Sequence, residues 1–193
     1  ALFAAMRAMW HASCGRFATL AFGLLLATGF HLFVQSRIAM LDVFMAAFLA
    51  VAAWQFAGSI REPETGRRRL VLTGIALGLA LGAKWNGALL LPLPGLVFAL
   101  NRWQALEGRR GGLLWASRGA GPVPGVSLVE AALWLGVVPV VVYLATFLPA
   151  FFYEKQPLTV GGLWHWQQYM LELQDSVKKP HTYMSVWWQW MAN

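Results

Sequence analysis

Arg37 and Asp42 are the residues whose types and position in this sequence best fit chemistry. They lie in the stretch QSRIAMLD, between apolar runs at residues 17–34 and 43–56. Ionisable groups at membrane depth are costly unless they face protein, water or a charged ligand. A guanidinium suits phosphate oxygens, and a carboxylate near a helix start is favoured by the helix dipole. The pair predicts a membrane-embedded active site; the alternative is two interface anchors, a snorkelling arginine and a dipole-stabilising aspartate.

Lys84 and Asn86 are two further candidates, in the stretch AKWNG between apolar runs. Lys84 follows the small-residue run GIALGLALGA, whose glycines and alanines allow close helix packing. It is either an interface anchor or a point charge aimed at an anionic ligand. Asn86 is a substrate-binding candidate, although capping of the following helix would also explain it.

The segment HTYMSVWWQW near the C-terminal end contains four alternating polar and aromatic residues. In an extended segment these side chains point the same way, and aromatic faces offer platforms for a sugar while His exchanges protons near neutral pH. The alternative is an aromatic belt at the lipid headgroups. The four residues are His181, Tyr183, Ser185 and Trp187.

The composition is that of an integral membrane protein. Of 193 residues, 59% are hydrophobic and only 12% charged, about half the charge of an ordinary soluble domain. Apolar segments at about 17–34, 41–57, 70–83, 86–100 and 127–150 predict an all-α transmembrane region over residues 1–150, and Pro139 is expected to kink the last helix. Residues 151–193 are predicted to form an extracytoplasmic, aromatic-rich loop with a short amphipathic helix in WHWQQYMLELQDSV.

The basic residues orient these segments. Ten of the fifteen lie in three connections that an alternating path places on one side, which the positive-inside rule makes cytoplasmic. The basic excess is therefore topological, and we expect no nucleic-acid partner. The ten are Arg7, Arg16, Arg61, Arg67, Arg68, Arg69, Arg102, Arg109, Arg110 and Arg118.

Other sequence features bear on disulfides, metals, cofactors and the extent of the sequence. One cysteine, Cys14, leaves no intrachain disulfide within this sequence, and the histidines show no metal-ligand spacing, so we predict no metal site. No Gly-rich nucleotide-binding loop is present, and we expect no cofactor, although a divalent metal is not excluded. The sequence opens ALFAAMRAMW and ends WQWMAN, and we expect it to be a fragment.

Three ordered stretches resemble one family. SRIAMLDVFMAAF resembles the S-R-x-x-x-L-D segment of the protein O-mannosyltransferases, and GLALGAKWNGALLLP resembles their next helix pair. HTYMSVWWQW is similar to a segment of bacterial phospholipid carrier-dependent glycosyltransferases. The resemblance implies a partial GT-C-type bundle with its active site at the extracytoplasmic face of a bacterial cytoplasmic membrane.

The resemblance also implies a reaction. Mannose would pass, with inversion, from a polyprenyl-phosphate carrier to Ser or Thr of a secreted or membrane protein. Arg37 would contact the carrier phosphate or support the pocket, and Asp42 would have a supporting role. The general base would belong to an Asp-Glu pair upstream of Ala1, so the fragment alone would be inactive.

Three alternatives remain open from the sequence. In the first alternative, the enzyme transfers another lipid-linked sugar, such as aminoarabinose, to a lipid or glycan acceptor. A transporter predicts polar residues near the bilayer midplane, whereas the charged groups here are expected to gather at one membrane face and the midplane stretches are apolar. A structural membrane protein would explain each residue as an anchor.

Overall fold

The structure is a computed structural model that describes residues 1–29, 40–106, 114–115 and 121–176. Within these ranges the elements are all helical and no residue lies in a β-strand. Contacts divide the chain into two units, Ala1–Phe147 and Leu148–Asn193, which are described separately. The division predicted at residue 150 stays a prediction, because contacts alone define these units.

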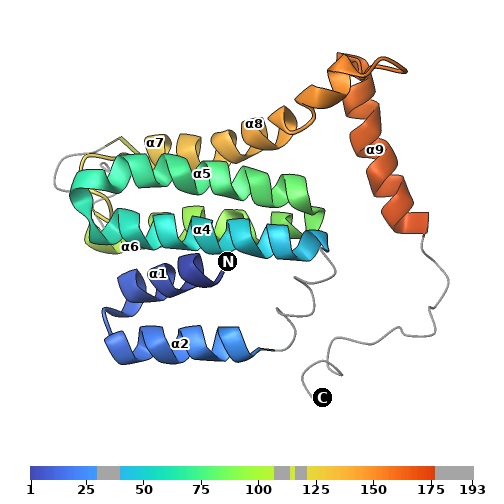
Figure 1. Cartoon of the computed structure of the whole chain (residues 1–193). Helices are drawn as coiled ribbons and strands as arrows, with labels where there is room; N and C mark the ends of the chain where they lie inside the picture. The colour runs from blue at the N-terminus through green and yellow to red at the C-terminus, as the bar shows by residue number, and fades with distance from the viewer. Residues whose placement is uncertain (30–39, 107–113, 116–120, 177–193) are drawn as a thin grey trace. The chain divides into compact units, whose positions relative to one another are not determined.

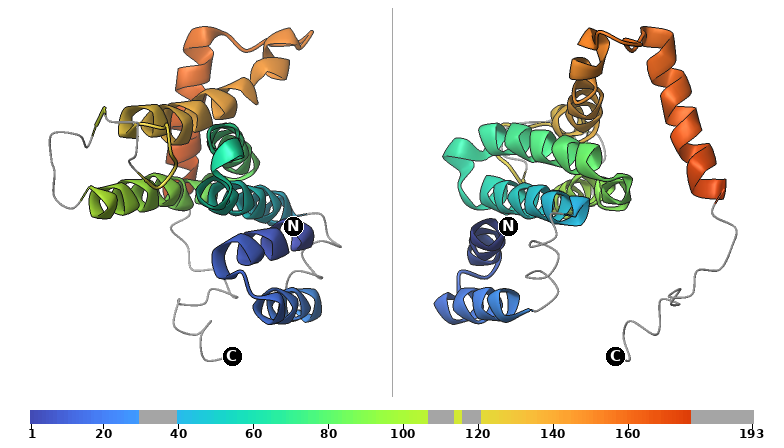
Figure 2. Two further views of the ribbon diagram at one scale, coloured as in Figure 1. Left: turned by 90° about the vertical axis from the view of Figure 1, so that its left-hand side faces the viewer. Right: turned by 45° about the vertical axis from the view of Figure 1, so that its right-hand side comes forward.

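The helices of the Ala1–Phe147 unit stack side by side, each packed on the next (Figure 1). Figure 2 shows the same order from two further directions. The order is α2 (Arg16–Thr28), α1 (Leu2–Ser13), α4 (Leu41–Arg61), α5 (Gly66–Ala83) and α8 (Val138–Ala145).

Helices α1 and α2 form a tight hairpin on the outside of this stack. Cys14 ends α1 in the left-handed conformation with φ 53°, and Gly15 then begins the return. The helices approach closely at Gly23, where a Cβ would lie 2.7 Å from the sulfur of Met6. The outer face of α2 is apolar, and Phe17 on it is 86% exposed. A face of this kind suits contact with lipid.

Helices α4 and α5 form the central antiparallel hairpin. The 21 residues of α4 span about 32 Å at 1.5 Å per residue, enough to cross a bilayer core. The short 3-10 helix η1 (Pro63–Thr65) joins the two helices. Pro63 opens it, where a missing N–H costs no helical hydrogen bond. The predicted segment 41–57 therefore extends four residues further, to Arg61.

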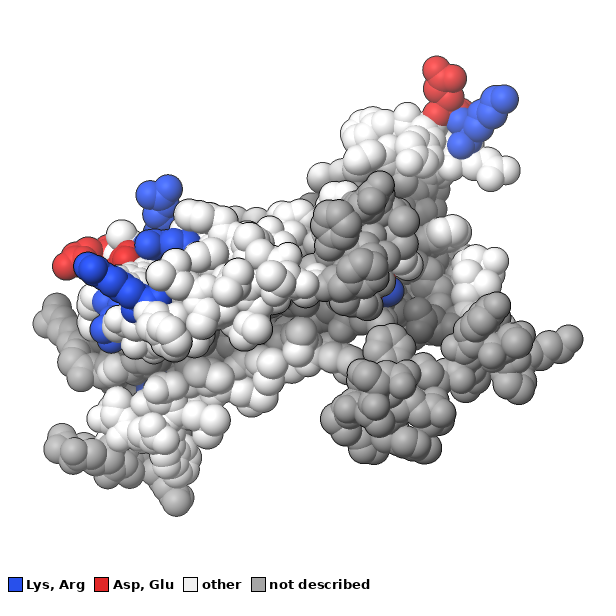
Figure 3. Space-filling model, turned by 60° about the horizontal axis from the view of Figure 1, so that its bottom comes forward, with Lys and Arg blue, Asp and Glu red and all other residues white. Residues whose placement is uncertain are grey.

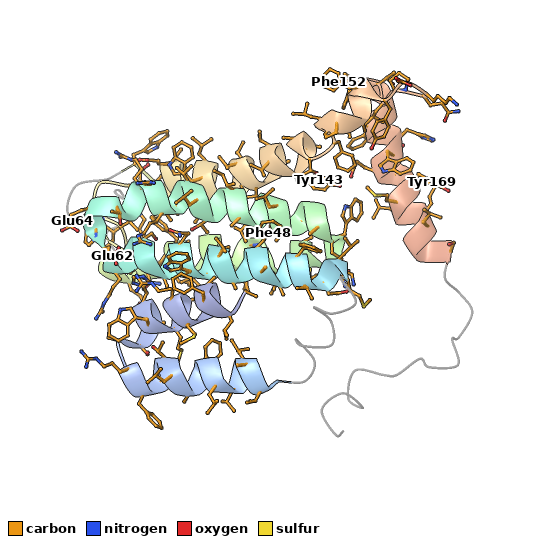
Figure 4. The ribbon with its side chains drawn as sticks, in the orientation of Figure 1. Phe48, Glu62, Glu64, Tyr143, Phe152 and Tyr169 are labelled. Atoms are coloured by element: carbon orange, nitrogen blue, oxygen red, sulfur yellow. The ribbon has the colours of Figure 1, made fainter. Side chains whose placement is uncertain are left out.

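Charged side chains gather at this α4–α5 turn (Figure 3). Arg69 donates to the carboxylate of Glu62, to Gln55 Oε1 at 3.2 Å and, through Nε, to Thr65 Oγ1 at 2.8 Å. The hydrogen bond from Arg69 is the main cause that lowers the pKa of Glu62 below its ordinary value. Figure 4 shows Glu62 and Glu64 at this end of the hairpin. The polar network ties α5 to α4 where both helices leave the apolar layer.

Helix α5 packs closely against its neighbours because its small residues let them approach. A Cβ on Gly74 would lie 2.0 Å from the carbonyl oxygen of Trp134, and one on Gly78 would lie 2.5 Å from that of Pro139. Both distances are far below van der Waals contact, so only glycine fits at these two positions. The close packing predicted from GIALGLALGA is present, and its partner is the segment that contains Pro139.

That segment is one helical run of three parts: α7 (Leu128–Ala132), the π-helical turn η4 (Leu133–Val137) and α8. Ser127 caps its start by accepting a hydrogen bond from the backbone N–H of Glu130 at 3.1 Å. Pro139 cannot donate a helical hydrogen bond, and proline is a known cause of local helix distortion. The structure has a π-helical turn immediately before α8, in which Pro139 is the second residue, and the predicted kink stays a prediction.

The remaining helix of this unit, α6 (Pro92–Ala105), follows the 3-10 helix η2 (Trp85–Leu90). The apolar segment predicted at 86–100 is therefore broken. The prediction that Arg102 is a loop charge is wrong, because its side chain is fully buried. It donates to the carbonyl of Val126 at 3.0 Å, which holds the start of the α7 segment against α6.

The Leu148–Asn193 unit contains the 3-10 helix η5 (Leu148–Phe152) and α9 (Val160–Ser176). The backbone N–H of Leu158 donates to the carbonyl of Ala150 at 3.0 Å and closes the connection between them. The predicted helix in WHWQQYMLELQDSV is confirmed. Trp164 and Trp166 on α9 are exposed, and the rings of Trp166 and Tyr169 lie 5.7 Å apart.

Two helical runs in the described residues are long and apolar enough to cross a membrane, Leu41–Arg61 and Leu128–Phe152. Large apolar side chains are exposed along α2, α6 and α8 of the first unit. The predicted fold class, an all-α membrane bundle of partial GT-C type, is confirmed.

Candidate functional site

The candidate site lies at the end of the α4–α5 hairpin opposite the charged turn. Asp42 is in the first turn of α4, which follows Met40 in an extended conformation. Lys84 is the C-terminal cap of α5, where the chain becomes extended with φ −160° and ψ 132°. Both residues therefore sit where a helix begins or ends, at the edge of the apolar layer.

Lys84 and Asp42 form an ion pair. Lys84 Nζ donates to Asp42 Oδ1 at 2.6 Å, and the side chains are 35% and 33% exposed, respectively. An ammonium group has three N–H donors, and Asp42 accepts from one of them. The amine is thus held in place by a carboxylate while it stays accessible from outside the bundle. This arrangement can present a fixed positive charge to an anionic ligand.

Sequence reasoning places Asp42 and Lys84 at the same, extracytoplasmic membrane face but does not predict that they pair. A signal is present: Asp42 lies 19 positions before the end of α4, and Lys84 lies 18 positions after the start of α5. In an antiparallel hairpin with a short turn, equal helical distances bring two residues to the same level. The stretch REPETGRRR marks that turn, so counting from it would have placed the two charges together.

Trp85, the residue after Lys84, links the backbone at the end of α5 to helix α8. The indole N–H of Trp85 donates to the hydroxyl of Tyr143 at 2.8 Å. Tyr143 is buried on α8, and its ring meets that of Phe147 edge to face at 5.4 Å. Figure 4 shows Tyr143 at the end of the unit away from Glu62. Lys84 is therefore held through its own ammonium group and through its neighbour.

Asn86 lies within the 3-10 helix η2 and is exposed. The prediction that it caps the following helix is wrong, because the N-cap residues are Lys84 for η2 and Leu91 for α6. Gly87 beside it is buried against the end of α5. The substrate-binding role of Asn86 stays a prediction.

The other predicted site residues lie outside the part of the chain that the structure describes. Arg37 falls in the undescribed range 30–39, and the four tail residues fall in 177–193. Their roles stay predictions. These four are His181, Tyr183, Ser185 and Trp187. Among the described residues, no three His, Cys, Asp or Glu side chains gather as metal ligands.

Comparison with known families decides the class. The family model of the dolichyl-phosphate-mannose-protein mannosyltransferases matches residues 3–153. The chain belongs to this mannosyltransferase family. The matched stretch runs from α1 to the end of η5 and includes Asp42, Lys84, Trp85 and Tyr143. No curated protein and no solved structure matches the chain.

Membership makes the protein a membrane glycosyltransferase of the mannosyltransferase kind. In a glycosyl transfer with an anionic leaving group, negative charge grows on that group as the sugar departs. Cationic donors placed where negative charge grows stabilise the transition state. The ammonium group of Lys84, partly accessible at the end of α5, is a cationic donor of this kind.

Proposed function

We propose that this protein transfers mannose from a polyprenyl-phosphate carrier to Ser or Thr residues of secreted or membrane proteins, with inversion at the sugar carbon. The observation that carries the proposal is the Lys84–Asp42 ion pair within the region matched by the mannosyltransferase family. The transfer experiment that tests the proposal also detects two alternatives, another donor sugar and a lipid acceptor.

The proposed reaction breaks one bond and forms one. The bond between the sugar C1 and the phosphate oxygen breaks, and its electron pair leaves with polyprenyl phosphate. The acceptor hydroxyl oxygen bonds to C1 from the opposite face, and its proton passes to a general base. We assign that base to none of the residues that the structure describes. The enzyme supplies position and charge, and the reaction as written calls for no cofactor.

Lys84 is the residue that we assign to the departing phosphate. Its ammonium group would donate to a phosphate oxygen with the N–H groups that do not point at Asp42. Asp42 would hold the ammonium group in position, which limits the side-chain entropy lost on binding. Arg37, which precedes Asp42 by five residues, would supply a second, forked donor to the same phosphate.

We place the enzyme in the cytoplasmic membrane of a bacterium with the Lys84 end facing the extracytoplasmic side. The arginine-rich α4–α5 turn supports this orientation through the positive-inside rule. The tail residues His181, Tyr183, Ser185 and Trp187 would then lie on the substrate side and contact sugar or acceptor. Partners would be the lipid-linked donor, the acceptor protein and the bilayer, with no nucleic acid.

Incubation of the full protein in liposomes with radiolabelled polyprenyl-phosphate mannose and a Ser/Thr-containing peptide tests the proposal. We expect label in the wild-type peptide and none in the same peptide with Ser and Thr replaced by Ala. Label in lipid but not in peptide would contradict the proposal that the acceptor is a protein. Transfer from polyprenyl-phosphate aminoarabinose but not from the mannose donor would contradict the proposal that the transferred sugar is mannose.

The Lys84→Met variant tests the carrying observation in the same assay. Removal of one charge-stabilising donor typically lowers kcat by a factor of about 10² to 10³. The matched control is Lys155→Gln, which removes an exposed lysine from the Leu148–Asn193 unit and should leave transfer unchanged. Equal activity of Lys84→Met and the wild type would contradict a role of Lys84 in the reaction.

A further inference from the structure

The turn after α5 connects this helix to two of its neighbours. Helix α5 lies between α4 and α8, and both pack against it (Figure 1). At the end of α5, Lys84 bonds to Asp42 on α4, and the next residue, Trp85, bonds to Tyr143 on α8. An extended backbone points successive side chains in opposite directions, and Lys84 is extended with φ −160° and ψ 132°. The local backbone therefore explains how two adjacent residues bond to helices on opposite sides of α5.

The backbone of this turn is tight. The N–H of Lys84 donates to the carbonyl of Ala80 at 3.1 Å, and the carbonyl of Lys84 accepts from the N–H of Gly87 at 3.0 Å. Gly87 is buried, and a Cβ there would lie 3.3 Å from the carbonyl oxygen of Ala80. Both backbone polar groups of Lys84 are thus bonded within the turn, and the side chain of Trp85 ties the turn to α8.

Tyr143 presents its hydroxyl from a helix that packs closely on α5. A Cβ on Gly78 would lie 2.6 Å from the Cβ of Val142, and one on Gly82 would lie 2.8 Å from Cγ2 of Thr146. Val142 and Thr146 lie on either side of Tyr143 in the sequence, and Tyr143 itself is buried. The acceptor of the Trp85 hydrogen bond therefore belongs to a well-packed part of the unit.

We propose that Tyr143 is a positioning residue of the carrier-phosphate site: by accepting the indole N–H of Trp85, its hydroxyl fixes the turn from which Lys84 reaches Asp42. The inference rests on the proposed function, in which the ammonium group of Lys84 meets the phosphate of the sugar carrier. That ammonium group ends a flexible four-carbon stem, so its place relative to a ligand depends on where the backbone is held. Tyr143 acts through Lys84 and needs no contact with the substrate.

Binding of polyprenyl phosphate and of polyprenyl alcohol to the full protein in nanodiscs tests the inference. Tyr143→Phe keeps the ring and removes the hydroxyl. We expect it to weaken binding of the phosphate about fivefold, as for one lost hydrogen bond, and to leave binding of the alcohol unchanged. Trp85→Phe removes the donor of the same bond, so the double variant should lose little more than either single variant. Tyr153→Phe is the matched control, because it removes an exposed tyrosine hydroxyl from the other unit.

A protein without the ammonium group separates positioning from a structural role. In the Lys84→Met background, Tyr143→Phe should leave the already weakened binding of the phosphate unchanged, because the hydroxyl acts through Lys84. Amide hydrogen exchange gives a readout that needs no ligand. In Tyr143→Phe, the backbone N–H groups of Lys84 and Gly87 should exchange faster than in the wild type, because the turn opens more often.

The possible failures are distinguishable. Full affinity for the phosphate in Tyr143→Phe, with a loss in Lys84→Met, would overturn the role of Tyr143 and leave the proposed function intact. An equal loss for phosphate and alcohol in Tyr143→Phe, or a further fivefold loss in the Lys84→Met background, would make Tyr143 a structural residue. A wild type that binds phosphate and alcohol equally would overturn the proposed function and this inference together.

Discussion

At the scale of single residues, the site depends on Asp42 and Lys84 holding one another. Each has an ordinary explanation alone, as a dipole-stabilising carboxylate and as an interface anchor. Together, at 2.6 Å and one-third exposed, they form an accessible ion pair that neither explanation requires. Trp85, bonded to Tyr143, fixes the same stretch of backbone from the other side. Under the proposed function, this pair would position the ammonium group that meets the carrier phosphate.

Asp42→Asn should separate the positioning role from a structural one. An amide cannot hold the ammonium group with the strength of a carboxylate, so Lys84 should become less ordered and bind the carrier phosphate more weakly. We expect KM for the lipid-linked sugar to rise about tenfold with an unchanged unfolding midpoint. Steady-state kinetics and thermal unfolding in detergent check both. A lower midpoint with unchanged KM would make Asp42 structural.

Glu62 should give a pH-dependent contribution to stability. Its pKa is lowered by Arg69, so the ionised form favours the folded state. That contribution is complete above the ordinary pKa of 4.5 and is lost as pH falls through the lower folded-state pKa. Glu62 is 38% exposed, and the effect should stay below about 1 kcal/mol.

Thermal unfolding of Glu62→Gln at pH 7 and at pH 3 measures this contribution. The variant should unfold at a lower temperature than the wild type at pH 7, and the difference should shrink at pH 3. Glu64→Gln is the control, because Glu64 is an exposed carboxylate at the same turn. A difference that grows on acidification would contradict the sign of the pKa shift.

At the scale of elements, the glycines of α5 set how closely the bundle packs. Gly78→Ala would place a methyl group 2.5 Å from the carbonyl oxygen of Pro139, so α8 must move or α5 must shift. Overpacking of this kind typically costs about 1–3 kcal/mol. Unfolding midpoints in detergent measure it. Gly95→Ala on α6 has open space around the added atom and should be neutral or stabilising; equal effects at both positions would contradict this packing.

Much of this element pattern is predictable from the sequence. The apolar runs, the turn in REPETGRRR and the small residues of GIALGLALGA indicate the α4–α5 hairpin and its close packing. Burial of Arg102 is not predictable in the same way, because an arginine after an apolar run is expected at the interface. Its partners include backbone carbonyls at Gly121 and Val126, which no residue pattern encodes. The position of the π-helical turn likewise depends on how Pro139 packs against α5.

At the scale of the whole molecule, the first unit has two chemically different ends. One end has the arginine-rich α4–α5 turn, and the other has a single ion pair beside apolar helix ends among the residues that the structure describes. This polarity supports the proposed orientation in the membrane.

Cys14 offers a direct test of orientation. It is the single cysteine of the sequence and lies exposed at the α1–α2 turn, at the arginine end. A membrane-impermeant maleimide should fail to label it in intact cells and should label it in inverted vesicles. The variant Cys14→Ser/Asn86→Cys moves the thiol to the other end and should reverse both results. Labelling of Cys14 in intact cells would invert the orientation.

Binding of polyprenyl phosphate, compared with the matching polyprenyl alcohol, tests the central claim most directly. The two ligands share the apolar tail and differ in the phosphate that Lys84 is proposed to contact. We expect the wild type to bind the phosphate at least tenfold more tightly, Lys84→Met to lose most of that preference, and Arg61→Gln to keep it. Equal binding of both ligands by the wild type, or an undiminished preference in Lys84→Met, would contradict a carrier-phosphate site at the Asp42–Lys84 end.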